Sequence, residues 1–205
     1  MPEPGASYYD RVRRWSATTK YAEEMARLWQ SMALPSGARV LDVGAGALGG
    51  LEFLSRQGLR PIGVDRGQGW ERFKNGHVVA RADAAALPFR DESFAGALLM
   101  HSLAHLARPV EGLHEIARVL TPGGRLGVLT PNALHLAVYR LPGLKDRHYR
   151  PDETVERHLR RSTLLALFQQ TPLRILRVET IGPGVLGLPL GSLRERLLLV
   201  AEKVA

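Results

Sequence analysis

Residues 40–50, VLDVGAGALGG, restrict the possible folds of this chain more than any other segment. The segment begins as an apolar strand and passes into a glycine-rich turn, after which a helical pattern follows. A strand that enters a helix through glycines lets a ligand approach the backbone closely. Gly44, Gly46 and Gly49 satisfy the G-x-G-x-x-G spacing, and Asp65 follows at the distance typical of this fingerprint. The segment therefore predicts a cofactor-binding turn between a strand and a helix.

The order of strand and helix patterns around this turn predicts an α/β domain. We expect strands at 39–43, 61–64, 78–80, 95–100, 125–130, 174–180 and 195–201. We expect helices at 20–33, 51–56, 110–120 and 162–170, with Ser162 as the N-cap of the last helix. Strands that alternate with helices form a mainly parallel sheet with helices on its faces.

The length of the chain suits a single domain over residues 1–205. Within it we assign residues 1–34 to an N-terminal helical cap. Residues 131–158 carry prolines, glycines and basic residues with weak periodicity. Long irregular segments in compact domains are often functional, so we expect a substrate lid over residues 131–160.

The chain has no cysteine, which excludes disulfides, thiolate metal ligands and cysteine nucleophiles. No apolar run is long enough for a membrane-spanning helix, and the first residues lack the apolar segment of a secretory signal. We therefore expect a cytoplasmic protein without a membrane span. We expect no metal site, because the helix that carries Glu111, His114 and Glu115 reads as an exposed polar face.

The formal net charge is +8 and comes mainly from arginine. The arginines are scattered and do not interleave with an aromatic series, which is typical of a solvated surface. The pattern therefore disfavours nucleic acid as a partner without excluding it. An anionic small molecule or a membrane surface also stays open as the reason for the charge.

Asp42 lies two residues before the first glycine and bears on the charge of the ligand. A dinucleotide would bring a doubly negative pyrophosphate to this turn, and a carboxylate would repel it. S-adenosylmethionine would bring an ammonium and a sulfonium, which a carboxylate attracts. Asp42 therefore favours S-adenosylmethionine over a nicotinamide or flavin dinucleotide. The alternative is that Asp42 caps the turn by accepting backbone N–H groups.

Two further acids follow expected strands. Asp65 ends the second strand, where a carboxylate can accept both hydroxyls of a ribose. Asp83 follows the third strand, where it can accept from an adenine amino group while the N–H of Ala84 reaches the ring. Each acid could instead cap a loop. Their positions after successive strands are what favours a role in binding adenosine.

These motifs, taken together, resemble the class I S-adenosylmethionine-dependent methyltransferase family, in its small-molecule branch known as methyltransferase type 11. The resemblance rests on VLDVGAG, IGVD, ADAAALPFRDESF, LLMHSLAHL and IARVLTPGGRLGVLTPN, in this order, and is strongest over residues 38–132. It implies a Rossmann-like three-layer sandwich with a seven-stranded, mostly parallel sheet. The implied strand order is 3-2-1-4-5-7-6, with the last-formed strand antiparallel.

The resemblance also implies a set of cofactor contacts. These fall to Asp42, Gly44, Ala45 and Gly46 at the methionine end, Asp65 at the ribose, Arg66, Asp83 and Ala84 at the adenine, Met100 near the amino group, and Tyr9 in a segment that folds over the cofactor. Core packing explains Tyr9 equally well. Leu48 departs from the pattern, because many relatives carry a third glycine there, and we expect a slightly shifted turn.

Methyl transfer from a sulfonium is an in-line displacement in which the protein mainly supplies position. A base is needed only where the acceptor is protonated at neutral pH. His101 and His105, where the fourth strand ends, are the candidates, although His105 could serve only packing. We expect methyl transfer to an unidentified small molecule. The alternatives are an RNA methyltransferase and a non-catalytic protein that binds S-adenosylmethionine.

Overall fold

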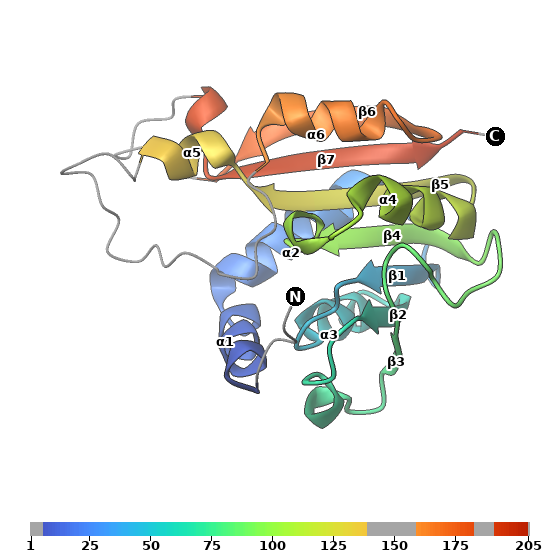
Figure 1. Cartoon of the computed structure of the whole chain (residues 1–205). Helices are drawn as coiled ribbons and strands as arrows, with labels where there is room; N and C mark the ends of the chain where they lie inside the picture. Colours follow the sequence, from blue (N-terminus) through green and yellow to red (C-terminus); the bar gives the residue numbers. More distant parts are fainter. Residues whose placement is uncertain (1–5, 139–158, 183–190, 205) are drawn as a thin grey trace.

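Seven strands form one sheet at the centre of the molecule. They are β1 (Arg39–Val43), β2 (Arg60–Asp65), β3 (Val78–Arg81), β4 (Phe94–Met100), β5 (Leu120–Pro131), β6 (Leu173–Ile181) and β7 (Arg196–Lys203). Their order across the sheet is β3-β2-β1-β4-β5-β7-β6 (Figure 1). β7 is antiparallel to both of its neighbours, and the other pairs are parallel. The computed structural model describes residues 6–138, 159–182 and 191–204, and it confirms the predicted fold class and strand order.

Helices cover both faces of this sheet (Figure 1). They are α1 (Ala6–Ser16), α2 (Thr19–Met32), α3 (Gly49–Arg56), α4 (Pro109–Val119), α5 (Ala133–Val138) and α6 (Arg161–Phe168), with single turns η1 (Glu71–Phe73), η2 (Leu103–His105) and η4 (Gly191–Leu193). The apolar stripe of α2 packs on one face together with Leu54 of α3. The stripes of α4 and α6 pack on the other face. This division produces the three layers that the resemblance implies.

Most elements begin and end within two residues of the sequence prediction, and two of the differences have a clear structural cause. Arg160 is the N-cap of α6, because its carbonyl oxygen accepts from Leu164 N at 2.9 Å, so Ser162 lies inside the first turn and the predicted N-cap is wrong. β5 begins at Leu120, before the strand predicted at 125–130, since Leu120 already pairs with Phe94. Residues 121–124 form a bulge between that pair and the next one, in which Arg125 pairs with Gly96.

The segment after β5 is helical at its start, where an irregular chain was expected. Leu134 N donates to Asn132 Oδ1 at 3.1 Å, which caps α5. His135 Nδ1 lies 2.9 Å from Leu193 O, so the helix is tied to η4. Six residues are too few to give a helical period, which explains the error. Residues 139–158 lie outside the described residues, so the substrate lid stays a prediction.

Among the described residues, no helix has both the length and the apolar character that crossing a membrane requires.

Candidate functional site

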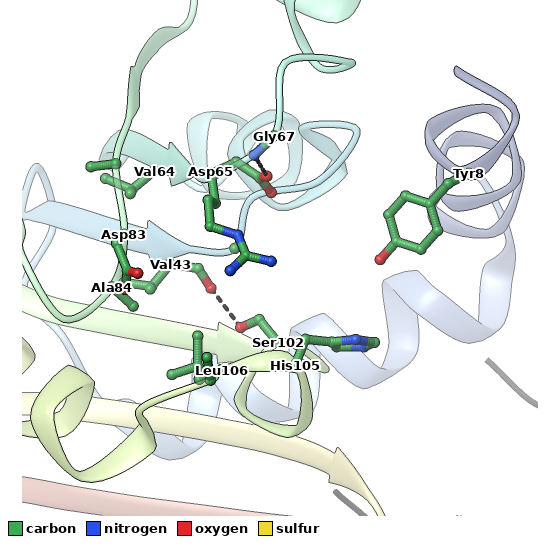
Figure 2. A pocket seen from close by; sticks show the side chains of 14 residues that line it. Tyr8, Val43, Val64, Asp65, Gly67, Asp83, Ala84, Ser102, His105 and Leu106 are labelled. Atoms are coloured by element: carbon green, nitrogen blue, oxygen red, sulfur yellow. Dashed lines mark hydrogen bonds between the residues drawn. The ribbon is translucent and has the colours of Figure 1, made fainter. Parts of the chain in front are cut away.

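A cavity of about 120 Å³ lies where β1, β2, β3 and β4 end. Its lining consists of Tyr8, Val43, Gly44, Val64, Asp65, Arg66, Gly67, Ala82, Asp83, Ala84, Ser102, His105, Leu106 and Ala107. In parallel sheets of this type, ligands bind at the carboxyl ends of the strands. Tyr8 of α1 faces the cavity from the side opposite Asp83 and Ala84 (Figure 2). The cavity is therefore built from strand ends and is bordered by the N-terminal helix.

The Asp65 carboxylate is the most heavily hydrogen-bonded group at this site. Its Oδ1 accepts from the Tyr9 hydroxyl at 3.0 Å and from Gly67 N at 2.9 Å, and the second of these bonds is drawn in Figure 2. Its Oδ2 accepts from Gly46 N at 2.8 Å. A carboxylate has about four acceptor positions. One position is therefore left for a ligand hydroxyl while Tyr9 stays in place.

Asp83 lies on the neighbouring side of the same cavity. Its Oδ1 accepts from Ala85 N at 2.8 Å, and its Oδ2 lies 3.6 Å from Arg108 Nη2. The side chain is 41% exposed, so it is accessible to a ligand. Asp65 and Asp83 thus present two carboxylates to one cavity from adjacent strands.

The loop after Asp83 is held in place by Arg118 of α4. The Arg118 guanidinium donates to Leu87 O at 3.0 Å and to Phe89 O at 2.8 Å. It also pairs with Glu115 and with Asp91, each at 2.7 Å. The hydrogen bond with Arg118 lowers the pKa of Glu115, which is therefore a carboxylate that accepts from Leu87 N. This clamp fixes the segment that carries Asp83.

The glycines of the turn accommodate protein neighbours at close range. A Cβ on Gly44 would overlap the Ser102 side chain, and a Cβ on Gly49 would overlap Ser16 of α1. A Cβ on Gly46 would lie 3.2 Å from Val12 Cγ1, also in α1. The glycine turn therefore contacts α1 as well as the cavity.

Leu48 adopts the backbone conformation that a glycine would favour. Its φ is +65°, and its side chain is fully buried beside Tyr9, Leu51 and Trp70. Left-handed backbone costs a residue with a Cβ about 1–2 kcal/mol, and burial of a leucine gains about 1.5–3 kcal/mol. The apolar contact therefore offsets the backbone strain, and the residue keeps the left-handed conformation despite the missing glycine.

Asp42 lies behind the turn, next to the helices. Its Oδ2 faces Gly50 of α3, and the residue is 3% exposed. Burial, and then the negative charge of Asp65, raise the pKa of Asp42 to about 7. The structure thus places an acid that is half protonated near neutral pH under the turn, and not in the cavity lining.

The predicted site residues divide into two groups. Those that line the cavity are Gly44, Asp65, Arg66, Asp83, Ala84 and His105. Those that lie beside it without lining it are Asp42, Ala45, Gly46, Met100, Tyr9 and His101. The second group sits on the side of the turn where α1 and α2 pack.

The two candidate histidines have different surroundings. His105 lies in η2 and lines the cavity, with its side chain directed toward the side of Tyr8 (Figure 2). His101 Nε2 lies 3.0 Å from Glu24 Oε2 of α2, and its ring packs edge-on against Trp15. His101 therefore belongs to an ion-paired cluster that the sequence did not predict.

Sequence reasoning missed the contribution of Ser102. Its hydroxyl donates to Val43 O at 2.5 Å and joins the ends of β4 and β1 (Figure 2). Ser102 also occupies the space beside Gly44. Its position between two histidines at a strand end was the available signal. Gly67 was missed too, although it follows Asp65 by only two residues.

No group of three or more histidine, cysteine or acidic side chains in the described residues is arranged to hold a metal ion. On α4, His114 Nε2 lies 2.8 Å from Gln170 O, and Glu115 is engaged by Arg118. His114 and Glu115 thus have structural partners, and Glu111 is exposed.

Comparisons with known proteins agree with this geometry. Residues 41–128 match a family described as "Methyltransferase domain". Demethylmenaquinone methyltransferase from Mycobacterium sp. (strain KMS) is 34% identical over 136 residues, which cover 62% of this chain and 59% of that protein. The protein of the same name from Mycolicibacterium paratuberculosis is 32% identical over 152 residues, with 68% and 66% covered. This chain therefore spans less than two thirds of the length of these curated relatives.

Solved structures share the fold across nearly the whole chain. A SAM-dependent methyltransferase from Aquifex aeolicus superposes with a TM-score of 0.73 at 16% identity and covers 96% of this chain and 98% of its own. A SAM-dependent methyltransferase from Thermotoga maritima, described as a possible histamine N-methyltransferase, gives 0.72 at 20% identity, with 97% of both chains covered. Residues 41–128 of the chain are thus similar to the methyltransferase domain family, and the chain has the class I fold of S-adenosylmethionine-dependent methyltransferases.

Proposed function

We propose that this protein transfers the methyl group of S-adenosylmethionine to a small-molecule acceptor. The observation that carries the proposal is the pair of carboxylates, Asp65 and Asp83, that line one cavity at the ends of adjacent strands. Asp65 has an acceptor position left for a ribose hydroxyl, and Asp83 is accessible to an amino group. An adenosine therefore fits the donor and acceptor chemistry of the cavity.

In this proposal Asp65, Arg66, Asp83 and Ala84 hold the adenosyl part. Asp42, Gly44, Ala45, Gly46 and Met100 act at the methionine end, and Tyr9 borders the ribose. When bound, S-adenosylmethionine supplies a methyl group activated by the positive sulfur. The residues of the chain orient that group and exclude water, which is the main contribution of a protein to such a displacement. His101 and His105 are the proposed proton acceptors.

A small-molecule acceptor is supported by the names of the relatives, which methylate demethylmenaquinone. The described arginines support it as well, because many of them pair within the chain, including Arg13 with Glu52 and Arg72 with Asp10. Paired arginines are less available to phosphate groups than free ones, so RNA is the weaker alternative.

Calorimetric titration with S-adenosylmethionine, S-adenosylhomocysteine and NADH tests the proposal. We expect both adenosyl ligands to bind at micromolar strength, and Asp65→Asn and Asp83→Asn to weaken binding by tenfold or more. Glu111→Gln, an exposed acid on α4, is the matched control and should bind as the unchanged protein does. Binding of NADH in their place would overturn the proposal. Binding without methylation of any acceptor would favour the non-catalytic alternative.

A further inference from the structure

A cluster of charged side chains is buried next to the cavity and is not used by the adenosyl site. Glu24 Oε2 lies 3.0 Å from His101 Nε2, and Glu24 Oε1 lies 3.2 Å from Arg196 Nε. Arg196 Nη1 lies 2.9 Å from Glu195 Oε1, and Lys20 Nζ lies 2.6 Å from the same oxygen. The side chains of His101, Glu24 and Arg196 are 14%, 9% and 12% exposed. Buried ion pairs stabilise folded proteins poorly, so this cluster calls for another explanation.

The protonation states in the cluster follow from its contacts. Burial, together with the positive charge of Arg196, lowers the pKa of His101 against the opposing effects of Glu24 and Glu195. Burial alone would raise the pKa of Glu24, but the hydrogen bond with His101 and the charge of Arg196 outweigh it and lower this pKa. At neutral pH the pair is therefore a carboxylate and a neutral imidazole. Because a carboxylate can only accept, the ring proton lies on Nε2 and Nδ1 is left as the acceptor.

The backbone of His101 gives a second, independent observation. Its φ is +60°, a left-handed conformation that is unfavourable for a residue with a Cβ. His101 N donates to Leu129 O at 2.7 Å and thereby fixes this conformation at the end of β4. The next residue, Ser102, lines the cavity. Strained residues of this kind concentrate at functional sites, and this one lies one residue from the cavity wall.

We propose that His101 accepts a proton from the methyl acceptor and that Glu24 is the positioning residue that fixes the tautomer of His101. The acceptor then attacks through an oxygen or nitrogen that carries a dissociable proton. The inference rests on the proposed function and specifies its substrate class. The lone pair of the acceptor atom forms the new bond to the methyl carbon, while the electron pair of the carbon–sulfur bond goes to sulfur. The proton leaves the acceptor for Nδ1 of His101, and the Glu24 carboxylate stabilises the imidazolium that results.

The charged groups that face His101 determine its pH dependence. They are Glu24 from α2 and Arg196 and Glu195 from β7 and the residue before it. Trp15 of α1 contributes an uncharged ring. Removal of the Glu24 charge would take away the largest effect that raises the His101 pKa. The acid limb of a pH–rate profile should therefore move to lower pH in Glu24→Gln.

Turnover gives the first test, with tritiated S-adenosylmethionine and two groups of probe acceptors. Hydroquinone and catechol carry dissociable protons at neutral pH, whereas pyridine and dimethyl sulfide carry none. We expect His101→Gln and Glu24→Gln to slow methylation of the first group at least tenfold and to shift the pH profile in Glu24→Gln. Glu23→Gln, an exposed neighbour on α2, should change neither. Equal slowing with both groups, or reaction of the second group alone, would overturn the proposal.

Nitrogen NMR of histidine-labelled protein gives a test that does not depend on turnover. At pH 7 the unchanged protein should show His101 as the neutral tautomer with its proton on Nε2. Glu24→Gln should lower the His101 pKa. A proton on Nδ1, or a charged ring at pH 7, would overturn the assignment of Glu24. Calorimetry with S-adenosylhomocysteine distinguishes a failure of this inference from a failure of the proposed function. If the proposed function holds, His101→Gln and Glu24→Gln should both bind this ligand within about twofold of the unchanged protein.

Discussion

The Tyr9 hydroxyl donates to Asp65 Oδ1 at 3.0 Å, so the N-terminal helix is joined directly to the carboxylate that ends β2. Tyr9 is 1% exposed and lies against Gly67 and Gly69, where a Cβ on either glycine would overlap its ring or its hydroxyl. The contact uses an acceptor position that a second ribose hydroxyl would need. The position of α1 and the occupancy of the cavity are therefore coupled through one oxygen atom.

Replacement of Tyr9 by Phe should strengthen the binding of S-adenosylhomocysteine by about twofold to tenfold. The change frees one acceptor position on Asp65, and a single hydrogen bond contributes a net of about 0.5–1.5 kcal/mol. Titration calorimetry at constant pH measures the effect. Tyr8→Phe is the control, because Tyr8 precedes Tyr9 on the same helix and lines the cavity, while the hydrogen bonds described for Asp65 come from Tyr9, Gly46 and Gly67. Weaker binding in Tyr9→Phe would mean that the hydroxyl supports the ligand and does not compete with it.

Replacement of Gly69 by Ala should destabilise the protein by about 1–3 kcal/mol, the usual cost of overpacking a filled site. The new Cβ would meet the ring of Tyr9 and push α1 away from the glycine turn. Gly191→Ala is the control, since a Cβ there meets no heavy atom within 4 Å in the described part of the chain. Urea denaturation compares the two variants. The same stability in both would show that Tyr9 is not held in the position described.

The sheet was predictable because its residues repeat a simple pattern. β1 and β2 are short apolar runs that end in Asp42–Val43 and Asp65, and the helices between strands carry a clear apolar period. Helix α5 escaped prediction because six residues do not complete two turns. These outcomes follow from local signals, which a single sequence contains.

The contacts around the site depend on tertiary packing, which a single sequence does not contain. Nothing in the spacing of Glu24 and His101 indicates that α2 would bring them together across 77 positions of the chain. Likewise, Arg118 was read as part of a family motif, while its guanidinium holds the loop of Asp83. The local residues of the cavity were thus accessible to prediction, and the partners that position them were not.

Replacement of Arg118 by Met should lower the free energy of unfolding by about 2–3 kcal/mol. The change keeps the apolar stem but leaves the oxygens of Leu87 and Phe89 without their charged donor. It should also weaken adenosine binding, because the loop that carries Asp83 loses its clamp. Arg174→Met provides the control, since Arg174 is 66% exposed and pairs only at the surface with Glu202. If thermal and chemical denaturation cannot distinguish the two variants, the clamp does not hold the loop.

The raised pKa of Asp42 makes both stability and ligand binding depend on pH. Its carboxyl has a pKa of about 7 in the folded chain and an ordinary value near 4 when unfolded. The unfolded chain therefore binds fewer protons between these values, so the contribution of Asp42 to stability is full below about pH 4 and is lost as the pH rises to about 7. The loss has an upper bound of about 4 kcal/mol. Asp42→Asn should remove this dependence and be more stable than the unchanged protein at pH 8, as measured by urea denaturation across the range.

The same carboxyl should couple the binding of S-adenosylmethionine to proton release. A cationic ligand favours the charged form of Asp42 and lowers its pKa, so affinity should rise with pH through about 7. At pH 7 the carboxyl is about half protonated, so binding should release up to about half a proton. Calorimetry detects this release as an enthalpy that varies with the ionisation enthalpy of the buffer. Asp42→Asn should bind more weakly and release no proton, whereas Glu111→Gln, at an exposed acid on α4, should behave as the unchanged protein does. An affinity independent of pH in the unchanged protein would mean that Asp42 caps the turn and does not act on the charge of the ligand.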